Sequence, residues 1–357
     1  MIIDLALYYL GGRGSVETII TELSRSFKKR GHTLRILMAY PSPNNKWLNT
    51  LDNVYYYGLG VPTNTGTYYN LAKNYRKLLT LIGKPDICLA TYTTLQSYIC
   101  YYALEENNKP SIPLISFLHG SLKTFYSKES IGFCTSHLAI STLMKEEIKK
   151  VVGEKRIYLI GNPVNMDNLD LVSRPTNKLK LLYLGSLEAE KNLSPLINAL
   201  SKIKGNWSLD SIGDGSLLNT LKEQSVNLRL SKKINYLGWQ DNPWLKVNEA
   251  SLIISTSTSE GFPLSLVEAL ARGIPVICQS IDTPKDFIIE GKNGWFIDIK
   301  EESKLISLLI NLINGSISLP NSEYCKESVK KFNSNIVIDN LEKILLKEIE
   351  FFNDSIL

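Results

Sequence analysis

The stretch STSTSEGFPLSLVEALARGIP sets two glutamates, Glu260 and Glu268, eight positions apart around a Gly-Phe-Pro turn. Proline suits the first turn of a helix because a helix start does not use the N–H that proline lacks, so a helix is predicted to open at Gly261-Phe262-Pro263. Glu260 then stands at the helix mouth, where free N–H groups favour anions, and Glu268 lies roughly 12 Å further along. A ligand that touches both carboxylates must be elongated, with hydroxyls at both ends and a diphosphate near the helix start. A nucleotide sugar fits this description, although the spacing alone also fits a helix-terminal charge and a solvated side chain.

Other residues suited to ligand binding follow predicted strands. Gly12 and Gly14 come after the first strand, and glycine lets the main chain approach a ligand closely. His119 stands at the end of the strand IPLISFLHG, where it could donate a hydrogen bond. Lys191 lies in the loop after LKLLYLG, where an ammonium can neutralise charge on a departing diphosphate. Each has a simpler explanation when taken alone: a tight turn, a loop histidine and a surface lysine.

The elements that must position these residues alternate between strands and helices. In the first half, apolar runs alternate with amphipathic stretches, and a second alternation begins after a polar linker at 162–178. This order predicts an α/β protein with two Rossmann-like, doubly wound domains that face an interdomain cleft. The predicted parts are a domain at 1–165, a second domain at 166–335 and a helix at 336–357 that crosses back to the first domain.

Composition limits the class of protein. The 357 residues are 44% hydrophobic and 21% charged, and no apolar run reaches the roughly eighteen residues that a transmembrane helix needs. The opening MIIDLALYYLGG has an acid at Asp4 and no basic flank, which predicts a buried strand and not a signal peptide. Five widely spaced cysteines are typical of reduced core thiols. We therefore expect a cytoplasmic protein.

The charge is distributed unevenly along the chain. Residues 1–165 contain 19 Lys and Arg against 11 Asp and Glu, whereas the remainder contains 21 against 24. Basic clusters at 28–30 and 145–150 would favour an anionic partner, either the surface of the inner membrane or a phosphorylated acceptor, but they also fit the solvated ends of two helices. The basic half lacks interleaved aromatic residues or a nucleic-acid-reading motif, so no nucleic acid is expected as a partner.

The string EGFPLSLVEALARGIPV resembles the E-x7-E signature of the retaining, GT-B fold glycosyltransferases of family 4. The segments GRGSVETII, LHGS, LGSLEAEKNL, IGDGS, NYLGWQ and GKNGWF also follow the order of that family, so the resemblance covers nearly the whole chain. Within the family, SHLAIST, GNPV, GWQDNPW and NGWF are most similar to lipopolysaccharide core galactosyltransferases that form a 1,6 linkage, and to related outer-core and capsule enzymes.

The resemblance implies that the domain at 1–165 is the acceptor-side domain and that the domain at 166–335 binds the nucleotide sugar. It also implies a role for each matching residue. Glu260 would contact the donor hexose and Glu268 the ribose, while His119 and Lys191 would join Glu260 as catalytic residues. The other residues implied to bind the donor are Gly12, Gly14, Gly185, Gly238, Trp239, Gly261, Phe262, Pro263, Leu264 and Ser265. Proline itself has no N–H to offer.

The chain departs from the family pattern at one position. An arginine normally follows the glycine of the loop that carries Lys191, and here Gly185 is followed by Ser186. Loss of this planar, always charged donor puts phosphate binding partly in doubt. Arg13, in the glycine loop of the other domain, is a conceivable substitute.

The resemblance implies transfer of a hexose from a UDP-sugar to a hydroxyl of a glycan or glycolipid acceptor, with retention. UDP-galactose is the first candidate donor, followed by UDP-glucose and UDP-N-acetylglucosamine. The sequence has no Asp-x-Asp pair and no His-Glu cluster with zinc spacing, so neither a metal nor another cofactor is expected. Two alternatives stay open: a nucleotide-sugar epimerase of the same fold, and a non-catalytic partner of another glycosyltransferase.

Overall fold

The computed structural model describes residues 1–12, 14–61 and 67–355. The chain divides into two compact units. The first comprises Met1–Asn165 together with Phe332–Leu357, and the second comprises Met166–Lys331. Each unit is built around a parallel sheet with helices packed on it, which matches the predicted α/β class.

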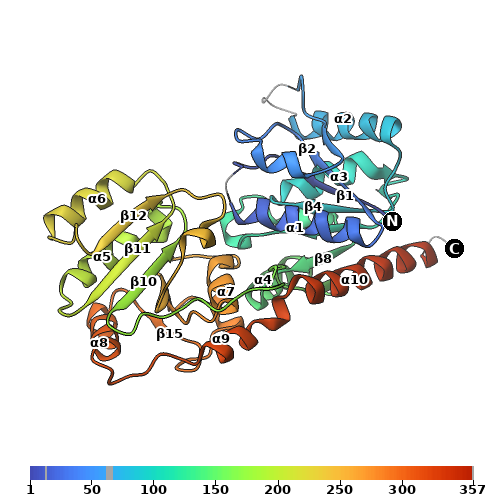
Figure 1. Cartoon of the computed structure of the whole chain (residues 1–357). Coiled ribbons are helices and arrows are strands. Elements are labelled where there is room, and N and C mark those ends of the chain that lie inside the picture. Colours follow the sequence, from blue (N-terminus) through green and yellow to red (C-terminus); the bar gives the residue numbers. More distant parts are fainter. Residues whose placement is uncertain (13, 62–66, 356–357) are drawn as a thin grey trace. The chain divides into compact units, whose positions relative to one another are not determined.

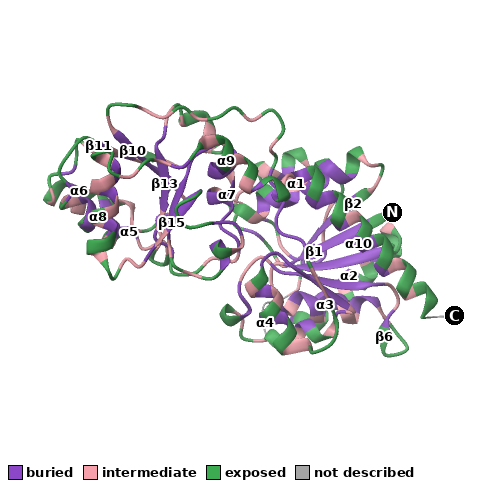
Figure 2. Cartoon of the chain, turned by 90° about the horizontal axis from the view of Figure 1, so that it is seen from below, coloured by how far each residue is buried: buried purple, intermediate pink, exposed green. Residues whose placement is uncertain are grey.

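The sheet of the first unit has the strand order β3-β2-β1-β4-β7-β8-β9 among the described residues. Its strands are β1 (Ile2–Leu7), β2 (Thr33–Met38), β3 (Val54–Tyr56), β4 (Ile87–Thr91), β7 (Leu114–Phe117), β8 (Ser136–Ala139) and β9 (Arg156–Leu159). All pairs between them are parallel. The central strands are buried along almost their whole length (Figure 2), because helices cover both faces of a parallel sheet.

The helices of the first unit are α1 (Ser15–Lys29), α2 (Thr67–Ile82), α3 (Leu95–Leu104), α4 (Thr142–Val152) and α10 (Ser334–Asp354), and a short hairpin joins β5 (Glu105–Glu106) to β6 (Lys109–Pro110). In α1, Ile19, Ile20, Leu23 and Phe27 recur at helical spacing, and all four are buried. The amphipathic pattern therefore identifies the core-facing side of this helix correctly.

The sheet of the second unit has the order β12-β11-β10-β13-β14-β15. Its strands are β10 (Leu179–Leu184), β11 (Trp207–Ile212), β12 (Ile234–Gly238), β13 (Leu252–Ser255), β14 (Val276–Gln279) and β15 (Gly294–Ile297). Its helices are α5 (Leu193–Ser201), α6 (Leu218–Asn227), α7 (Leu264–Ala271), α8 (Glu302–Ile313) and α9 (Ser322–Ser328). Figure 1 shows β10, β11 and β12 side by side, and one apolar core joins these strands to α5 and α8.

Some element bounds differ from the sequence-based expectation. Helix α7 begins at Leu264, one residue later than expected, because Pro263 has a ψ of 82°, which is outside the helical range. Strand β9 ends at Leu159, although the apolar pattern continues to 164. The sequence patterns do not predict helices α2, α3, α8 and α9.

Helix α10 belongs to the first unit although it follows the second unit in the sequence. Arg30 at the end of α1 pairs with Asp339 and Glu342 on α10. Further along, Arg156 Nε donates to Glu348 Oε1 at 2.7 Å. These contacts fasten both ends of α10 to elements made from residues 1–165.

The remaining global features concern cysteines, membrane spans and metals. The five cysteines are free and buried. Within the described ranges, no helix is both long and apolar enough to pass through a bilayer. Across the same ranges, no group of three or more His, Cys, Asp or Glu side chains is arranged as a metal site.

Candidate functional site

A charged pair lies at the carboxyl edge of the second unit's sheet. Lys191 follows β10, Glu260 follows β13, and these strands are neighbours, so their carboxyl ends meet. Lys191 Nζ donates to Glu260 Oε1 at 2.7 Å. Both side chains stay partly accessible, with 22% and 18% of their surface exposed. A ligand atom at this point would therefore meet an ammonium and a carboxylate together.

Hydrogen bonds hold the loops that carry this pair. Thr256 Oγ1 donates to the carbonyl of Lys191 at 3.0 Å, and the N–H of Thr258 donates to the carbonyl of Glu190 at 3.0 Å. Thr283, after β14, donates its hydroxyl to the carbonyl of Glu260 at 2.8 Å. Loops that follow β10, β13 and β14 are thus tied to one another, which fixes where the charged pair stands.

Close packing of glycines shapes the neighbouring part of the same edge. The N–H of Gly213 donates to the carbonyl of Gly238 at 2.9 Å, and the N–H of Gly185 donates to the carbonyl of Ile212 at 3.1 Å. A Cβ on Gly213 would lie 1.8 Å from the carbonyl oxygen of Gly185, and the φ of Gly213 is +147°. Only glycine fits here, so the IGDG turn packs directly against the loop that leads to Lys191.

Ser186, which stands where the family has an arginine, lies within this loop. The carbonyl of Ser186 accepts a hydrogen bond from the buried hydroxyl of Tyr183 at 2.7 Å. Burial and the nearby carboxylates of Glu260 and Glu190 raise the pKa of Tyr183, so this phenol stays a neutral donor. Arg13, the conceivable substitute for the arginine, lies outside the described residues.

The turn into α7 is anchored by an aromatic contact. Phe262 is buried, and its ring centroid lies 5.9 Å from that of Phe287. Gly261 and Pro263 complete the turn, and Leu264 and Ser265 form the first turn of the helix, where N–H groups have no intrahelical acceptor. The predicted donor-binding N–H groups therefore stand at a helix start next to Glu260.

Glu268 lies on α7 in contact with Arg272, which helical spacing places on the same face, and with Trp244, which the sequence did not connect to it. Trp244 Nε1 donates to Glu268 Oε2 at 2.9 Å. The guanidinium of Arg272 lies 4.2 Å from the centroid of the Trp244 ring and donates through Nη1 to the carbonyl of Glu268 at 2.9 Å. These contacts with Trp244 and Arg272 fix the orientation of the Glu268 carboxylate.

Burial shifts the pKa values of both Glu268 and Arg272. Burial raises the pKa of Glu268, and the Trp244 hydrogen bond and the charge of Arg272 oppose that rise. Burial also lowers the pKa of Arg272, while Glu268 opposes that change. Glu268 is therefore protonated more readily than a solvated carboxylate, and its charged form depends on its two neighbours.

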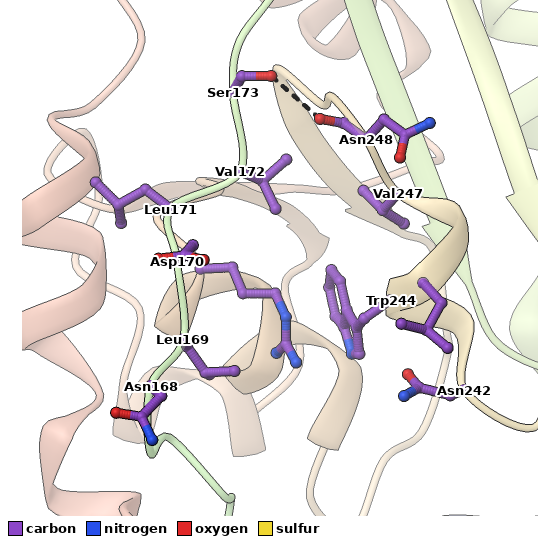
Figure 3. A pocket seen from close by; sticks show the side chains of 12 residues that line it. Asn168, Leu169, Asp170, Leu171, Val172, Ser173, Asn242, Trp244, Val247 and Asn248 are labelled. Atoms are coloured by element: carbon purple, nitrogen blue, oxygen red, sulfur yellow. Dashed lines mark hydrogen bonds between the residues drawn. The ribbon is translucent and has the colours of Figure 1, made fainter.

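Trp244 and Arg272 also line a pocket of about 580 Å³. Figure 3 shows Trp244 facing the segment that carries Leu169 and Asp170, with Val247 and Asn248 on a neighbouring wall. The pocket belongs entirely to the second unit, and Trp244 forms part of its wall while holding Glu268 through its N–H.

Trp244 is a residue of this site that the sequence did not identify. Trp239 donates through Nε1 to Asp241 Oδ1 at 3.1 Å, whereas Trp244 contacts Glu268. Trp244 lies in the short turn η5 (Pro243–Lys246), which has no periodic pattern that would aim its ring. No spacing in the sequence signals this contact. The donor-binding role implied for Trp239 stays a prediction.

The glycine loop of the first unit closes on its own helix. Gly12 donates its N–H to Glu17 Oε1 at 2.7 Å and has a φ of +82°. A Cβ on Gly12 would lie 2.1 Å from the carbonyl oxygen of Asn44, and one on Gly14 would lie 2.9 Å from Glu17 Oε2. Gly12 is therefore required by the shape of the loop, whereas a Cβ on Gly14 would meet only the end of the Glu17 side chain. Glu17 stabilises the loop through its hydrogen bond with Gly12.

His119 lies after β7, at the carboxyl edge of the first unit's sheet. Both of its ring nitrogens are buried without a hydrogen-bond partner, and its ring centroid lies 4.4 Å from that of Phe117. Burial lowers the pKa of His119 to about 4, while Asn162 opposes the shift. The imidazole is therefore neutral at pH 7.

The structure therefore distributes the predicted residues over two separate edges. Lys191 and Glu260 meet in the second unit, where Glu268 lies on the helix that follows. Gly12, Gly14 and His119 belong to the first unit.

Two family models match the chain in succession. Residues 14–168 match "Glycosyltransferase Family 4", and residues 169–332 match "Glycosyl transferases group 1". Together with the architecture of the two units, these matches establish the class: the chain belongs to the family 4 glycosyltransferases of GT-B fold. The resemblance predicted from the sequence is confirmed.

Individual relatives narrow this class. The lipopolysaccharide 1,6-galactosyltransferase of Escherichia coli K12 is 28% identical, and the match covers 95% of this chain and 96% of that protein. Among solved structures, the apo form of a lipopolysaccharide outer core galactosyltransferase superposes with a TM-score of 0.84 at 23% identity, over 98% of this chain and all of the other. An Anabaena protein solved with UDP and glucose gives a TM-score of 0.79 at 17% identity, over 97% of this chain and all of the other. The protein is thus a glycosyltransferase of the lipopolysaccharide galactosyltransferase type.

Proposed function

We propose that this protein transfers galactose from UDP-galactose to a hydroxyl of a lipopolysaccharide core or another cell-surface glycan, with retention of anomeric configuration and without a metal. The observation that carries the proposal is the Lys191–Glu260 pair at the start of α7, with Glu268 held two helical turns further on. This arrangement offers a cation where a diphosphate would lie and carboxylates at both ends of an elongated donor.

The donor would bind along α7. Glu260 would accept hydrogen bonds from the hexose hydroxyls, and the N–H groups of Leu264 and Ser265 would serve phosphate oxygens at the helix start. Glu268 would accept from the ribose hydroxyls through Oε1, because Trp244 occupies Oε2. These contacts orient the anomeric carbon before reaction.

The transfer exchanges one bond at the anomeric carbon for another. The bond from this carbon to the phosphate oxygen breaks, and the electron pair leaves with the diphosphate. The acceptor oxygen forms the new bond on the same face, and its proton passes to the departing phosphate oxygen. Lys191 stabilises the negative charge that grows on the diphosphate. The hydrogen bond from Lys191 to Glu260 holds the ammonium group within reach of that diphosphate.

The sugar and the acceptor are inferred from relatives. The E. coli relative acts as a lipopolysaccharide 1,6-galactosyltransferase, and the Anabaena structure contains UDP and glucose. UDP-galactose is therefore the first donor to test, with UDP-glucose and UDP-N-acetylglucosamine next. His119, neutral and with unpartnered nitrogens, would donate to a sugar hydroxyl.

A peripheral location on the cytoplasmic face of the inner membrane is part of the proposal. The excess of basic residues in 1–165, 19 against 11 acidic ones, supports attraction to anionic lipids, where glycolipid acceptors are also found. Binding to phosphatidylglycerol vesicles should weaken as salt is added.

The decisive experiment separates transfer from other reactions of the donor. Nucleotide sugars are ranked by thermal shift, and the best one is incubated with and without core oligosaccharide acceptors, in the presence of EDTA. The proposal expects a new glycoside whose NMR coupling constants show the anomeric configuration of the donor. Conversion of the donor without acceptor would instead establish an epimerase, and donor binding without any turnover would establish a non-catalytic partner.

A further inference from the structure

A buried carboxylate on α4 holds the loop that follows His119. Glu147 lies on the core-facing side of α4, on the same face as the buried side chains of Met144 and Ile148, and 7% of its surface is exposed. Helical spacing makes this a position for an apolar residue. The adjacent Glu146 is exposed to solvent, as a glutamate on a helix usually is. The burial of Glu147 therefore needs a reason of its own.

The carboxylate of Glu147 accepts hydrogen bonds from the start of the short helix η2 (Leu122–Thr124) and from the residue before it. The hydroxyl of Ser121 donates to the carboxylate and lies 2.8 Å from Oε1 and 2.9 Å from Oε2. The N–H of Leu122 donates to Oε2 at 2.8 Å. Ser121 also caps η2, because its Oγ accepts from the N–H of Lys123 at 3.2 Å. One carboxylate thus holds both a side chain and the main chain of the same loop.

Another buried carboxylate of the first unit shows what a structural role looks like here. Asp4 on β1 accepts from Arg35 Nε on the neighbouring strand β2 at 2.5 Å, and both side chains are almost completely buried. This ion pair joins two strands of the sheet. Glu147 differs, because its cation is Lys123, whose Nζ lies 3.9 Å from Oε1 and whose side chain is 78% exposed. The donors close to Glu147 are the neutral groups of one loop.

His119 lies two residues before this anchored segment. Both nitrogens of its ring lack a hydrogen-bond partner among the described residues, so no polar contact of the ring fixes its position. The residue between, Gly120, has more conformational freedom than any other residue type, and a Cβ on it would meet nothing closer than the ring of Phe125 at 4.0 Å. The bonds from Ser121 and Leu122 to α4 therefore limit how far the main chain of His119 can move.

Packing alone does not explain a carboxylate at this position. Taking a carboxylate out of water costs free energy that its hydrogen bonds return only in part, and an apolar side chain of similar size would pack α4 at least as well. An apolar side chain could not bind the hydroxyl of Ser121 and the N–H of Leu122 at fixed points. The presence of Glu147 therefore favours a role in the conformation of the loop over a role in the core.

We propose that Glu147 is a positioning residue, which holds the imidazole of His119 where it meets the sugar during transfer. This inference rests on the proposed function, in which His119 donates to a sugar hydroxyl. Glu147 itself would touch no substrate and would act only through His119. Such a residue matters because a small displacement of the group that it holds lowers the rate of reaction.

The first test observes the imidazole directly and does not depend on turnover. The chain has three histidines, so NMR of isotopically labelled histidine gives few signals, and His137 on β8 serves as an internal reference. Spectra are compared for wild type and for Glu147→Gln, which keeps the size of the side chain and removes its charge. Glu146→Gln makes the same change at the adjacent exposed residue and is the matched control. Thermal melting shows whether each variant is folded.

We expect Glu147→Gln to shift the signals of His119 and to leave those of His137 in place, whereas Glu146→Gln should match wild type. Burial lowers the pKa of His119 to about 4, and Asn162 opposes the shift. A loosened loop admits water to the ring, so the pKa of His119 should rise in Glu147→Gln toward the ordinary value of about 6.5. Unaltered His119 signals would overturn the proposal. Equal shifts at His119 and His137 would also overturn it, because they indicate a general change of fold.

A double-mutant cycle connects the position of the imidazole to the reaction. In the transfer assay, Glu147→Gln should lower kcat roughly tenfold, the effect of a modest misplacement of a reacting group. In a His119→Ala background the same substitution should have no further effect, because Glu147 would then have nothing to position. Residues that act independently give effects that add. Additive losses in the cycle would therefore contradict a role through His119.

Ser121 supplies a second pair of variants in case Glu147→Gln does not fold. Ser121→Ala removes the hydroxyl that the carboxylate binds, and Ser121→Thr keeps a hydroxyl. We expect Ser121→Ala to shift the His119 signals and Ser121→Thr to restore them, and in that case unchanged signals in Ser121→Ala would overturn the proposal. If the variants move the imidazole as expected but the wild type transfers no sugar, the positioning of His119 stands and the proposed transfer fails.

Discussion

The carboxyl edges of the two sheets have the same topology and different chemistry. In the second unit the edge carries a formed ion pair, Lys191 with Glu260. In the first unit it carries tyrosines and the neutral imidazole of His119, and the carboxylate of Glu17 is occupied by the glycine loop. A doubly wound sheet determines where a ligand binds, and the side chains at its edge determine which ligand. The second edge thus offers formal charge, whereas the first offers neutral aromatic groups.

Among the substitutions that test this difference between the edges, removal of the Lys191 charge should have the largest effect on activity. Lys191→Met is expected to lower kcat about a hundredfold, because a charge aimed at the leaving group stabilises the transition state. Lys202→Met, which breaks the surface pair of Lys202 with Glu302 in the same unit, should leave kcat unchanged. If steady-state kinetics give equal rates for both variants, the second edge does not act through its charge.

Neutralising Glu268 should have the next largest effect. Glu268→Gln keeps the shape of the side chain and removes the charge that would accept from the ribose, so the Kd for UDP should rise about tenfold or more. Glu223→Gln changes an exposed carboxylate on α6 and serves as the control. Calorimetry that finds the same Kd for wild type and Glu268→Gln would remove Glu268 from the donor site.

Trp244 should have a smaller effect because it acts through Glu268. Trp244→Phe removes the indole N–H and keeps an aromatic ring over Arg272, and we expect UDP affinity to fall roughly three- to tenfold, the worth of one hydrogen bond to a charged group. Trp207→Phe removes an indole N–H that donates to the carbonyl of Ile203 in the same unit, so its Kd for UDP should match wild type.

The pH profile of UDP binding distinguishes positioning by Trp244 from a merely structural role. Burial already raises the pKa of Glu268, and the Trp244 hydrogen bond holds that pKa down. Without this bond the carboxyl takes up its proton at a higher pH, so the acid-side loss of UDP affinity should move to higher pH in Trp244→Phe. If the pH profile of UDP binding is the same in Trp244→Phe and wild type, Trp244 has only a structural role.

The smallest expected effect is on the pH dependence of stability, to which a buried histidine of the first unit contributes. His137 on β8 is fully buried, and burial followed by the charge of Lys155 lowers its pKa to about 3, while Glu348 opposes the shift. Because the unfolded chain binds this proton near pH 6.5 and the folded chain does not, stability is lost as the pH falls below that value. Between pH 8 and pH 6 the loss is roughly 0.8 kcal/mol for such a histidine.

His137→Asn should flatten this dependence. Asparagine can keep a partner for Ser116, whose hydroxyl lies 2.7 Å from Nδ1 of His137. Urea unfolding at the two pH values should then show a smaller difference in unfolding free energy than wild type, whatever the stability at pH 8. An unchanged difference would mean that His137 does not titrate as its burial requires.

Local pattern and a family signature made much of the molecule predictable. Continuous apolar runs identified the buried parallel strands, and helical periodicity identified the core face of α1. The signature around Glu260 identified the turn into α7. These features depend on residues close together in the sequence, which is the range over which patterns carry information.

The unpredicted features depend on contacts between distant residues. Trp244 and Glu268 are 24 positions apart, and nothing local aims the indole at the carboxylate. Tyr92 has a φ of +76°, which no glycine at this position would lead one to expect, and Thr91 beside it donates its hydroxyl to the carbonyl of Phe117, 26 positions away. Helix α3 has a mostly apolar surface with little amphipathic contrast, so its period is difficult to detect.

The discontinuous first unit has a consequence for biosynthesis. Arg30 and Arg156 leave the ribosome long before Asp339, Glu342 and Glu348, with which they pair. All of Met166–Lys331 is translated in between. The first unit can therefore complete its fold only after the whole of the second unit has been translated.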